Sequence, residues 1–138
     1  MKKILILLFF CGSTSLINAQ SNRPFCGYFQ NKEYNVYLKF NFYDNNILVP
    51  GQEIFGEIPG YFGDKNDGRK WLITTAKIIN NKEARIDLTD DYGSEDLTGT
   101  IVIVNDSTIT LTQGEGSSLK IARNRKWIKL PKKLEFKE

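Results

Sequence analysis

The sequence predicts a small all-β protein, an antiparallel up-and-down barrel with a C-terminal meander. Apolar and polar residues alternate over residues 34–43 and again over residues 83–89, which is the period of a half-buried strand. Clusters of glycine, proline and asparagine separate such runs at short intervals. No segment of ten or more residues has the period of a helix. A two-sheet β-sandwich is the alternative architecture.

The clearest strand is predicted at residues 34–43, where Val36, Leu38 and Phe40 fall on one face. We expect this face to line the core. Residues 71–79 instead carry apolar side chains on both faces, so that strand is expected to be covered on both sides or to pack against a long loop. Further strands are predicted at residues 25–30, 47–49 and 52–58.

The C-terminal half allows a prediction of register. A three-residue loop at residues 105–107 pairs Ile103 with Ile109 and Ile101 with Leu111, which keeps the apolar residues on one face. A two-residue turn would mix the two faces, so we expect the longer loop.

The same rule extends the meander. A second three-residue loop would pair Leu111 with Leu119, and a tight turn at residues 124–125 would bring Ile128 opposite Ile121. We therefore expect four consecutive antiparallel strands at the end of the domain.

Residues 1–19 have the form of a secretion signal. Lys2 and Lys3 precede seven apolar residues, and small or polar residues lead to Ala19, after which we expect cleavage. The apolar run is shorter than the ~20 residues needed to span a bilayer. A lipoprotein modified at Cys11 is the alternative, but Phe10 stands where the processing peptidase requires a small residue. We expect a secreted or periplasmic bacterial protein without a membrane span.

The remaining chain divides into a single all-β domain, residues 20–130, and a basic C-terminal tail, residues 131–138. Cys26 is the only cysteine after the leader, so no internal disulfide can form; we expect it to be a buried apolar residue. We expect a monomer. The predicted core includes six large aromatic residues: Trp71, Trp127, Phe25, Phe40, Phe42 and Phe55.

Composition narrows the function. The chain has no histidine, which removes the commonest general base and zinc ligand, and we expect no metal, cofactor or catalytic residue. Residues 20–138 carry 17 basic and 16 acidic residues, too small a surplus for nucleic-acid binding. A carboxylate-dependent hydrolase ranks low. Its one candidate pair is Glu53 and Glu57, predicted to lie on one strand face. Lipocalins are comparable in size, but their Gly-x-Trp signature is absent, and we assign no family.

Two features are candidates for a binding site. Residues 59–64 are predicted to form a glycine-punctuated loop presenting Tyr61 and Phe62, a type of residue common at interfaces; the alternative is that one ring plugs the barrel end. Residues 120–138 hold eight basic and two acidic residues. They form either a solvated face, paired with the acidic loop at residues 90–96, or a site for an anionic partner. The candidate basic residues are Lys120, Arg123, Arg125 and Lys126.

We accordingly expect a non-enzymatic domain that binds a protein, as inhibitors and immunity proteins do. The alternative is a carrier of a small apolar ligand inside the barrel. An open interior next to Leu38, Phe40 and Phe42 would favour the carrier. A filled interior with Tyr61 and Phe62 exposed would favour the binding domain.

Overall fold

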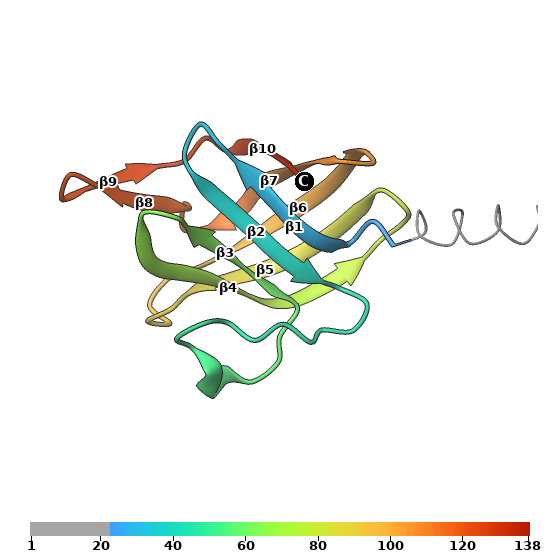
Figure 1. Ribbon diagram of the computed structural model, residues 1–138, viewed down its shortest axis with the longest axis horizontal. Coiled ribbons are helices and arrows are strands. Elements are labelled where there is room, and N and C mark those ends of the chain that lie inside the picture. Colours follow the sequence, from blue (N-terminus) through green and yellow to red (C-terminus); the bar gives the residue numbers. More distant parts are fainter. Residues whose placement is uncertain (1–22) are drawn as a thin grey trace, which may run out of the picture.

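A computed structural model describes residues 23–138 as a closed barrel of eight antiparallel strands with a separate two-stranded sheet (Figure 1). The barrel order is β1-β10-β7-β6-β5-β4-β3-β2, so the predicted barrel is confirmed over the sandwich. The barrel strands are β1 (Cys26–Asn31), β2 (Val36–Asn41), β3 (Gly60–Asp64), β4 (Asp67–Ile78), β5 (Glu83–Asp90), β6 (Asp96–Asn105), β7 (Thr108–Gly116) and β10 (Lys133–Lys137); β8 (Lys120–Arg123) and β9 (Lys126–Lys129) form the second sheet.

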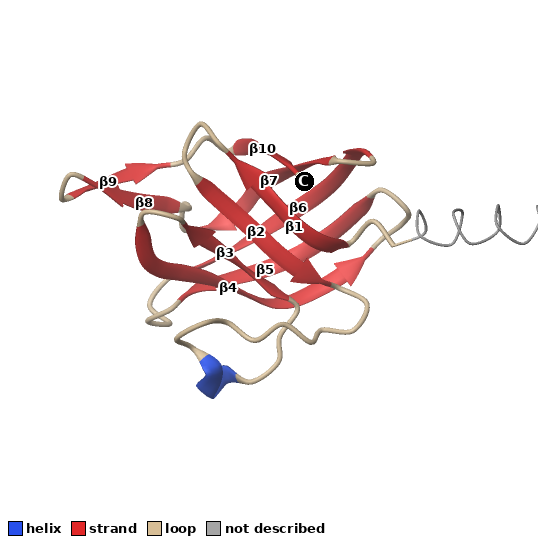
Figure 2. Cartoon of the chain, in the orientation of Figure 1, coloured by secondary structure: helices blue, strands red, loops and turns tan. Residues whose placement is uncertain are grey.

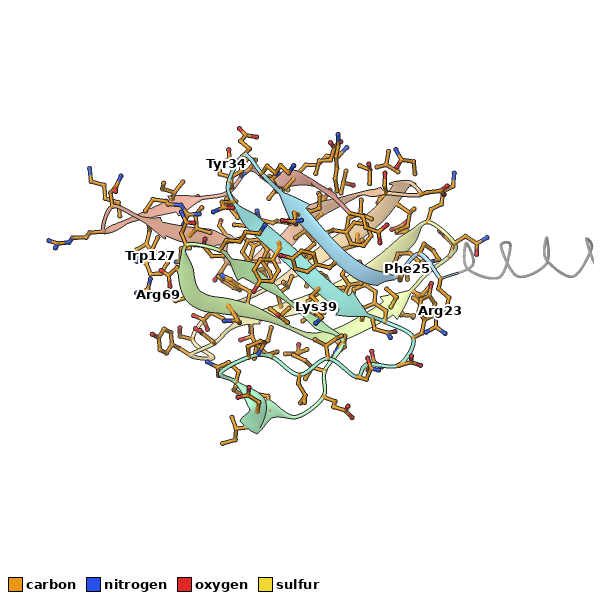
Figure 3. All side chains as sticks on the ribbon, viewed as in Figure 1. Arg23, Phe25, Tyr34, Lys39, Arg69 and Trp127 are labelled. Atoms are coloured by element: carbon orange, nitrogen blue, oxygen red, sulfur yellow. The ribbon has the colours of Figure 1, made fainter. Side chains whose placement is uncertain are left out.

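The predicted alternation places the core correctly. Val36, Leu38 and Phe40 of β2 are fully buried inside the barrel, and Ala84 and Ile86 of β5 are buried with them. Aromatic rings occupy part of this interior. The Phe40 ring stacks on those of Phe29 and Phe42, with ring centroids 5.5 and 4.6 Å apart (the side chains are drawn in Figure 3).

The first predicted hairpin of the meander is confirmed. β6 pairs with β7 so that Ile103 faces Ile109 and Ile101 faces Leu111. The next predicted pairing is wrong, because the other neighbour of β7 is β10 rather than β8. Leu134 faces Leu111 in that pairing.

Residues 131–138 are therefore not a tail. β10 closes the barrel, with Leu134 and Phe136 buried between exposed charged residues. The alternation of apolar and charged residues in β10 is visible in the sequence. It extends over only five residues, however, and three nearby lysines give the segment the composition of a solvated chain end. The charged residues lie on the outer face of the strand, where water solvates them.

β8 and β9 leave the barrel as a hairpin that projects to one side (Figure 1, orange to red). Ile121 faces Ile128 as predicted. Asn124 and Arg125 have φ angles of 53° and 64°, the left-handed conformation that a two-residue turn with native strand twist requires.

Residues 59–64 do not form a loop, because most of them belong to β3. Gly60 and Gly63 allow β3 to lie close against β2: a Cβ atom at Gly63 would overlap the Tyr37 ring, and one at Gly60 would overlap the Lys39 carbonyl. The glycines therefore serve close approach of two strands rather than a turn. Tyr61 and Phe62 are buried, which corrects their prediction as an exposed pair.

The predicted strands at residues 47–49 and 52–58 are replaced by a long loop with one turn of 3-10 helix, η1 (Glu53–Phe55), the helical turn drawn in Figure 2. A single bridge joins Ile47 to Ile58. Val49 anchors the loop by packing with Tyr61 and Leu72 on the outside of the barrel. The loop therefore covers Leu72 on the second apolar face of the 71–79 strand, as predicted, whereas Ile78 and Ile79 at the end of that strand are exposed.

The predicted signal peptide, with Cys11 and Ala19, lies outside the described residues. Within residues 23–138, no helix is long and apolar enough to cross a membrane. Cys26 lies on β1 as expected, but its exposure is intermediate rather than fully buried.

Candidate binding site at the barrel mouth

A pocket of about 190 Å³ lies at one mouth of the barrel, between the β3–β4 turn, the β5–β6 loop and the β8–β9 hairpin. Its lining includes the buried side chains of Phe62, Trp71 and Ile121. Tyr92 and Trp127 also line it and are exposed, Trp127 with 57% of its surface accessible. The pocket therefore combines an apolar floor with exposed aromatic rings.

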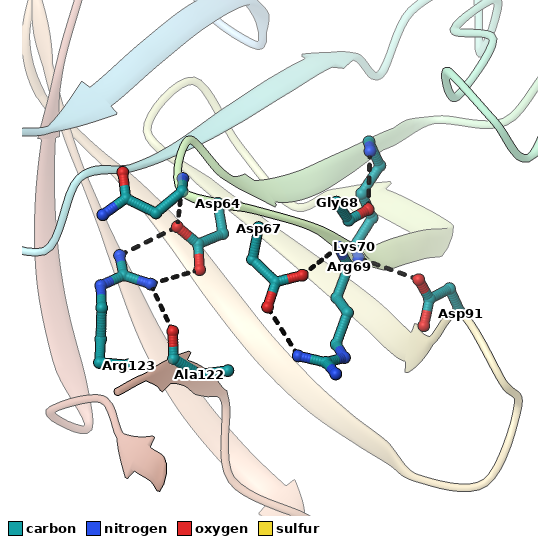
Figure 4. A network of polar contacts seen from close by, with 9 residues as sticks. Asp64, Asp67, Gly68, Arg69, Lys70, Asp91, Ala122 and Arg123 are labelled. Carbon is teal, nitrogen blue, oxygen red and sulfur yellow. Dashed lines mark hydrogen bonds and ion pairs between the residues drawn. The ribbon is translucent and has the colours of Figure 1, made fainter. Parts of the chain in front are cut away.

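A buried ion pair fixes the hairpin to the barrel. The Arg123 guanidinium at the end of β8 donates to both carboxylate oxygens of Asp64, at 2.6 and 2.9 Å (Figure 4). The Asp64 side chain is only 4% exposed. Arg123 also donates to the backbone oxygens of Tyr34, at 2.7 Å, and Ala122, at 2.9 Å. The hydrogen bonds with Asp64 raise the pKa of Arg123, so the guanidinium stays charged.

Two more ion pairs surround Trp127. Arg69 donates to Asp67 at 2.6 Å and lies 5.0 Å from the centroid of the Trp127 ring, next to which it is labelled in Figure 3. Lys120 pairs with Glu95 at 2.8 Å, and its ammonium lies 5.7 Å from the same ring. Each cation attracts the electron-rich ring, so the indole is held in place although it is exposed.

The acidic loop between β5 and β6 forms another wall. Asp90 accepts hydrogen bonds from the Ser94 hydroxyl, at 2.8 Å, and from the backbone N–H groups of Ser94 and Glu95. Burial acts to raise the pKa of Asp90, but these hydrogen bonds outweigh it and lower the pKa. Asp91 accepts from the Lys70 backbone N–H at 3.1 Å (Figure 4). With Glu95 bound to Lys120, the loop does face the basic end of the chain, as predicted.

The structure separates the predicted site residues. Lys120 lines the pocket and is paired with Glu95, whereas Arg123 does not line it but is paired with Asp64, which does. Arg125 and Lys126 lie exposed on the projecting hairpin. Phe62 belongs to the pocket wall, whereas Tyr61 packs with Leu72 and Val49 on the outside of the barrel.

Trp127, Tyr92 and Arg69 line the pocket but were not among the predicted site residues. Trp127 was predicted to lie in the core, because large aromatic residues usually supply core area, and this prediction is wrong because its side chain is exposed. One signal was available: Trp127 directly follows Arg125 and Lys126, an unusual setting for a core tryptophan.

A cluster of metal ligands and the predicted Glu53–Glu57 pair can both be looked for within residues 23–138. No group of three or more His, Cys, Asp or Glu residues within 23–138 could hold a metal ion. Glu53 and Glu57 lie on the loop around η1 rather than on one strand face, so the single candidate pair for hydrolysis loses the arrangement on which it depended.

No family model matches the chain, and comparisons with curated proteins and with solved structures give no match either.

Proposed function

We propose that this chain is an exported, non-enzymatic domain that binds an acidic protein partner through the β8–β9 hairpin and the adjoining pocket. The observation that carries the proposal is the Asp64–Arg123 pair, which fixes the hairpin while Trp127 and Ile128 remain exposed on it. A fixed hairpin needs little ordering when it binds, which favours affinity.

The residues around the pocket are of the kinds that dominate binding energy at protein interfaces. Trp127, Tyr92 and Arg69 come from three different segments and line one pocket. Tryptophan, tyrosine and arginine are the residues most enriched among interface hot spots. Asp90 and Asp91 line this pocket and form no ion pair within residues 23–138, so the pocket is suited to one uncharged or basic side chain of the partner, with the exposed rings packing around it.

The charge of the hairpin indicates the nature of the partner. Residues 120–129 contain five basic residues and no acidic one. Arg125, Lys126 and Lys129 form no ion pair with any residue of the described chain, 23–138. Unpaired cations around exposed apolar groups attract a negatively charged surface and speed its association. This supports an acidic protein over a neutral one.

The alternative of a small-ligand carrier has weaker support. Leu38, Phe40 and Phe42, which would line an internal cavity, are buried against other core side chains. A wider hollow of about 750 Å³ lies at the opposite mouth, beside Cys26 and Ile103. None of those three interior side chains lines it.

An affinity experiment tests the proposal. The native protein, a Trp127→Ala variant and an Arg125→Glu/Lys126→Glu variant are used as bait for envelope and secreted proteins of the source bacterium. Val104→Ala is the matched control, because Val104 is 54% exposed on β6, near the opposite mouth. We expect the native and Val104→Ala baits to retain one acidic protein, in a salt-sensitive manner, and both hairpin variants to lose it. Equal retention by all four baits would refute the binding role of the hairpin.

A further inference from the structure

A second exposed apolar surface lies on the loop that carries η1, below the barrel in Figure 1. Ile54 is 92% exposed at the tip of this loop, and its neighbour Phe55 is 51% exposed although it was predicted to lie in the core. Leu48 is exposed on the same loop. Because Val49 anchors the loop through a fully buried side chain, this surface is held on the barrel by packing. Exposed apolar groups gathered on one surface mark an interaction site.

The charge of this loop is opposite to that of the hairpin. Residues 44–58 contain three acidic residues and no basic one. Asp44 is paired with Arg23, whereas Glu53 and Glu57 flank the exposed Ile54 and Phe55 and form no ion pair within residues 23–138. The loop thus presents apolar groups between carboxylates, and the hairpin presents apolar groups between cations.

We propose that the η1 loop of one molecule binds the β8–β9 hairpin of a second copy, so that the protein associates head to tail. The inference rests on the proposed function, because it uses the same basic, aromatic surface of the hairpin. The acidic ligand is in this case the η1 loop of a second copy of the chain. Self-association then competes with the partner for the hairpin and regulates its availability. The proposal differs from the expectation of a monomer, which was based on the sequence and took no account of these two exposed surfaces.

The two surfaces are different parts of the chain, so the contact is heterologous. Each molecule in such a contact keeps one free loop or one free hairpin, so association continues beyond the dimer, into a ring where the rotation between copies closes and into open chains where it does not. An isologous dimer would instead use one patch twice. This difference makes the proposal testable by mixing variants.

The test uses sedimentation velocity at increasing protein concentration. Ile54→Lys removes the loop surface and leaves the hairpin intact, and Trp127→Glu does the reverse. Both sites are exposed, so neither change should affect folding, which circular dichroism checks. Val104→Lys is the control for a charge placed on an exposed apolar residue elsewhere.

We expect the native protein and Val104→Lys to form species larger than dimers as concentration rises, and to dissociate as salt rises. Each interface variant alone should stay monomeric, and an equimolar mixture of the two should form a one-to-one heterodimer and nothing larger. Native protein that stays monomeric, an interface variant that still associates alone, or a mixture that stays monomeric would overturn the inference. Retention of an acidic partner by the Ile54→Lys variant would show in that case that the proposed function survives.

Discussion

Replacing Arg123 by methionine is expected to destabilise the fold by about 3 kcal/mol. The change keeps an extended side chain but leaves the Asp64 carboxylate, 4% exposed, without its counter-ion. Removing one partner of a buried ion pair costs roughly 3–5 kcal/mol. The lower end applies here because the Arg123 side chain is 21% exposed and Asp64 keeps a hydrogen bond from the Asn66 backbone N–H at 3.0 Å. A loss of this size lowers the melting temperature of a domain of this length by roughly 12 °C.

Urea denaturation followed by tryptophan fluorescence measures this change, with Arg125→Met as the matched control. Arg125 lies two residues away, is exposed and forms no ion pair within residues 23–138, so its replacement should change the unfolding free energy by less than about 0.5 kcal/mol. The double variant Asp64→Asn/Arg123→Met should recover part of the loss, because it removes the unpaired charge. An Arg123→Met protein as stable as Arg125→Met would show that the pair does not fix the hairpin.

Three further changes test the fold. Phe136→Ala should lower the unfolding free energy by about 3–5 kcal/mol, because the Phe136 side chain is fully buried in β10. A near-neutral effect in urea denaturation would instead favour the prediction that residues 131–138 are a tail outside the barrel. Arg125→Gly should raise the unfolding free energy by about 1 kcal/mol, because glycine adopts the φ of 64° without strain. A lower urea midpoint would refute the left-handed conformation of residue 125 in the β8–β9 turn. Asp90, whose folded pKa is lowered from 3.8, stabilises the fold above that value and loses this contribution as pH falls through the folded pKa. The urea midpoint of Ser94→Ala should therefore lie below the native one at neutral pH and converge with it in acid, whereas a constant difference would exclude this linkage.

The parts of the fold predicted correctly are those in which each strand has one apolar and one polar face. β2, β5 and the β6–β7 pairing follow from alternation alone, because a shift of one residue would turn Ile101 or Ile109 outward. β3 was missed because Gly60 and Gly63 have the composition of a turn, and only the neighbouring strand shows that they permit close packing. β10 was missed because its partner, β7, had already been assigned to β8 by an equally apolar register.

The site was predicted in part. Clustered charge made Lys120 and Arg123 candidates, but the sequence could not show that both are paired with carboxylates distant along the chain. Trp127 was assigned to the core because alternation distinguishes the two faces of a strand. It does not show whether either face packs against the barrel interior. The exposure of Trp127 follows from the hairpin leaving the barrel, which only the closure by β10 makes evident.

Photocrosslinking from position 127 tests the role of the hairpin most directly. A photoreactive amino acid replaces Trp127 in the full-length protein, produced in the organism from which the sequence comes, and the same amino acid replaces Val104 as the control. We predict one dominant adduct from position 127, with an acidic protein or with the η1 loop of a second copy, and its loss when Arg125 and Lys126 are changed to glutamate. Absence of any adduct from position 127, or the same adducts from positions 127 and 104, would contradict the assignment of the β8–β9 hairpin as the binding surface.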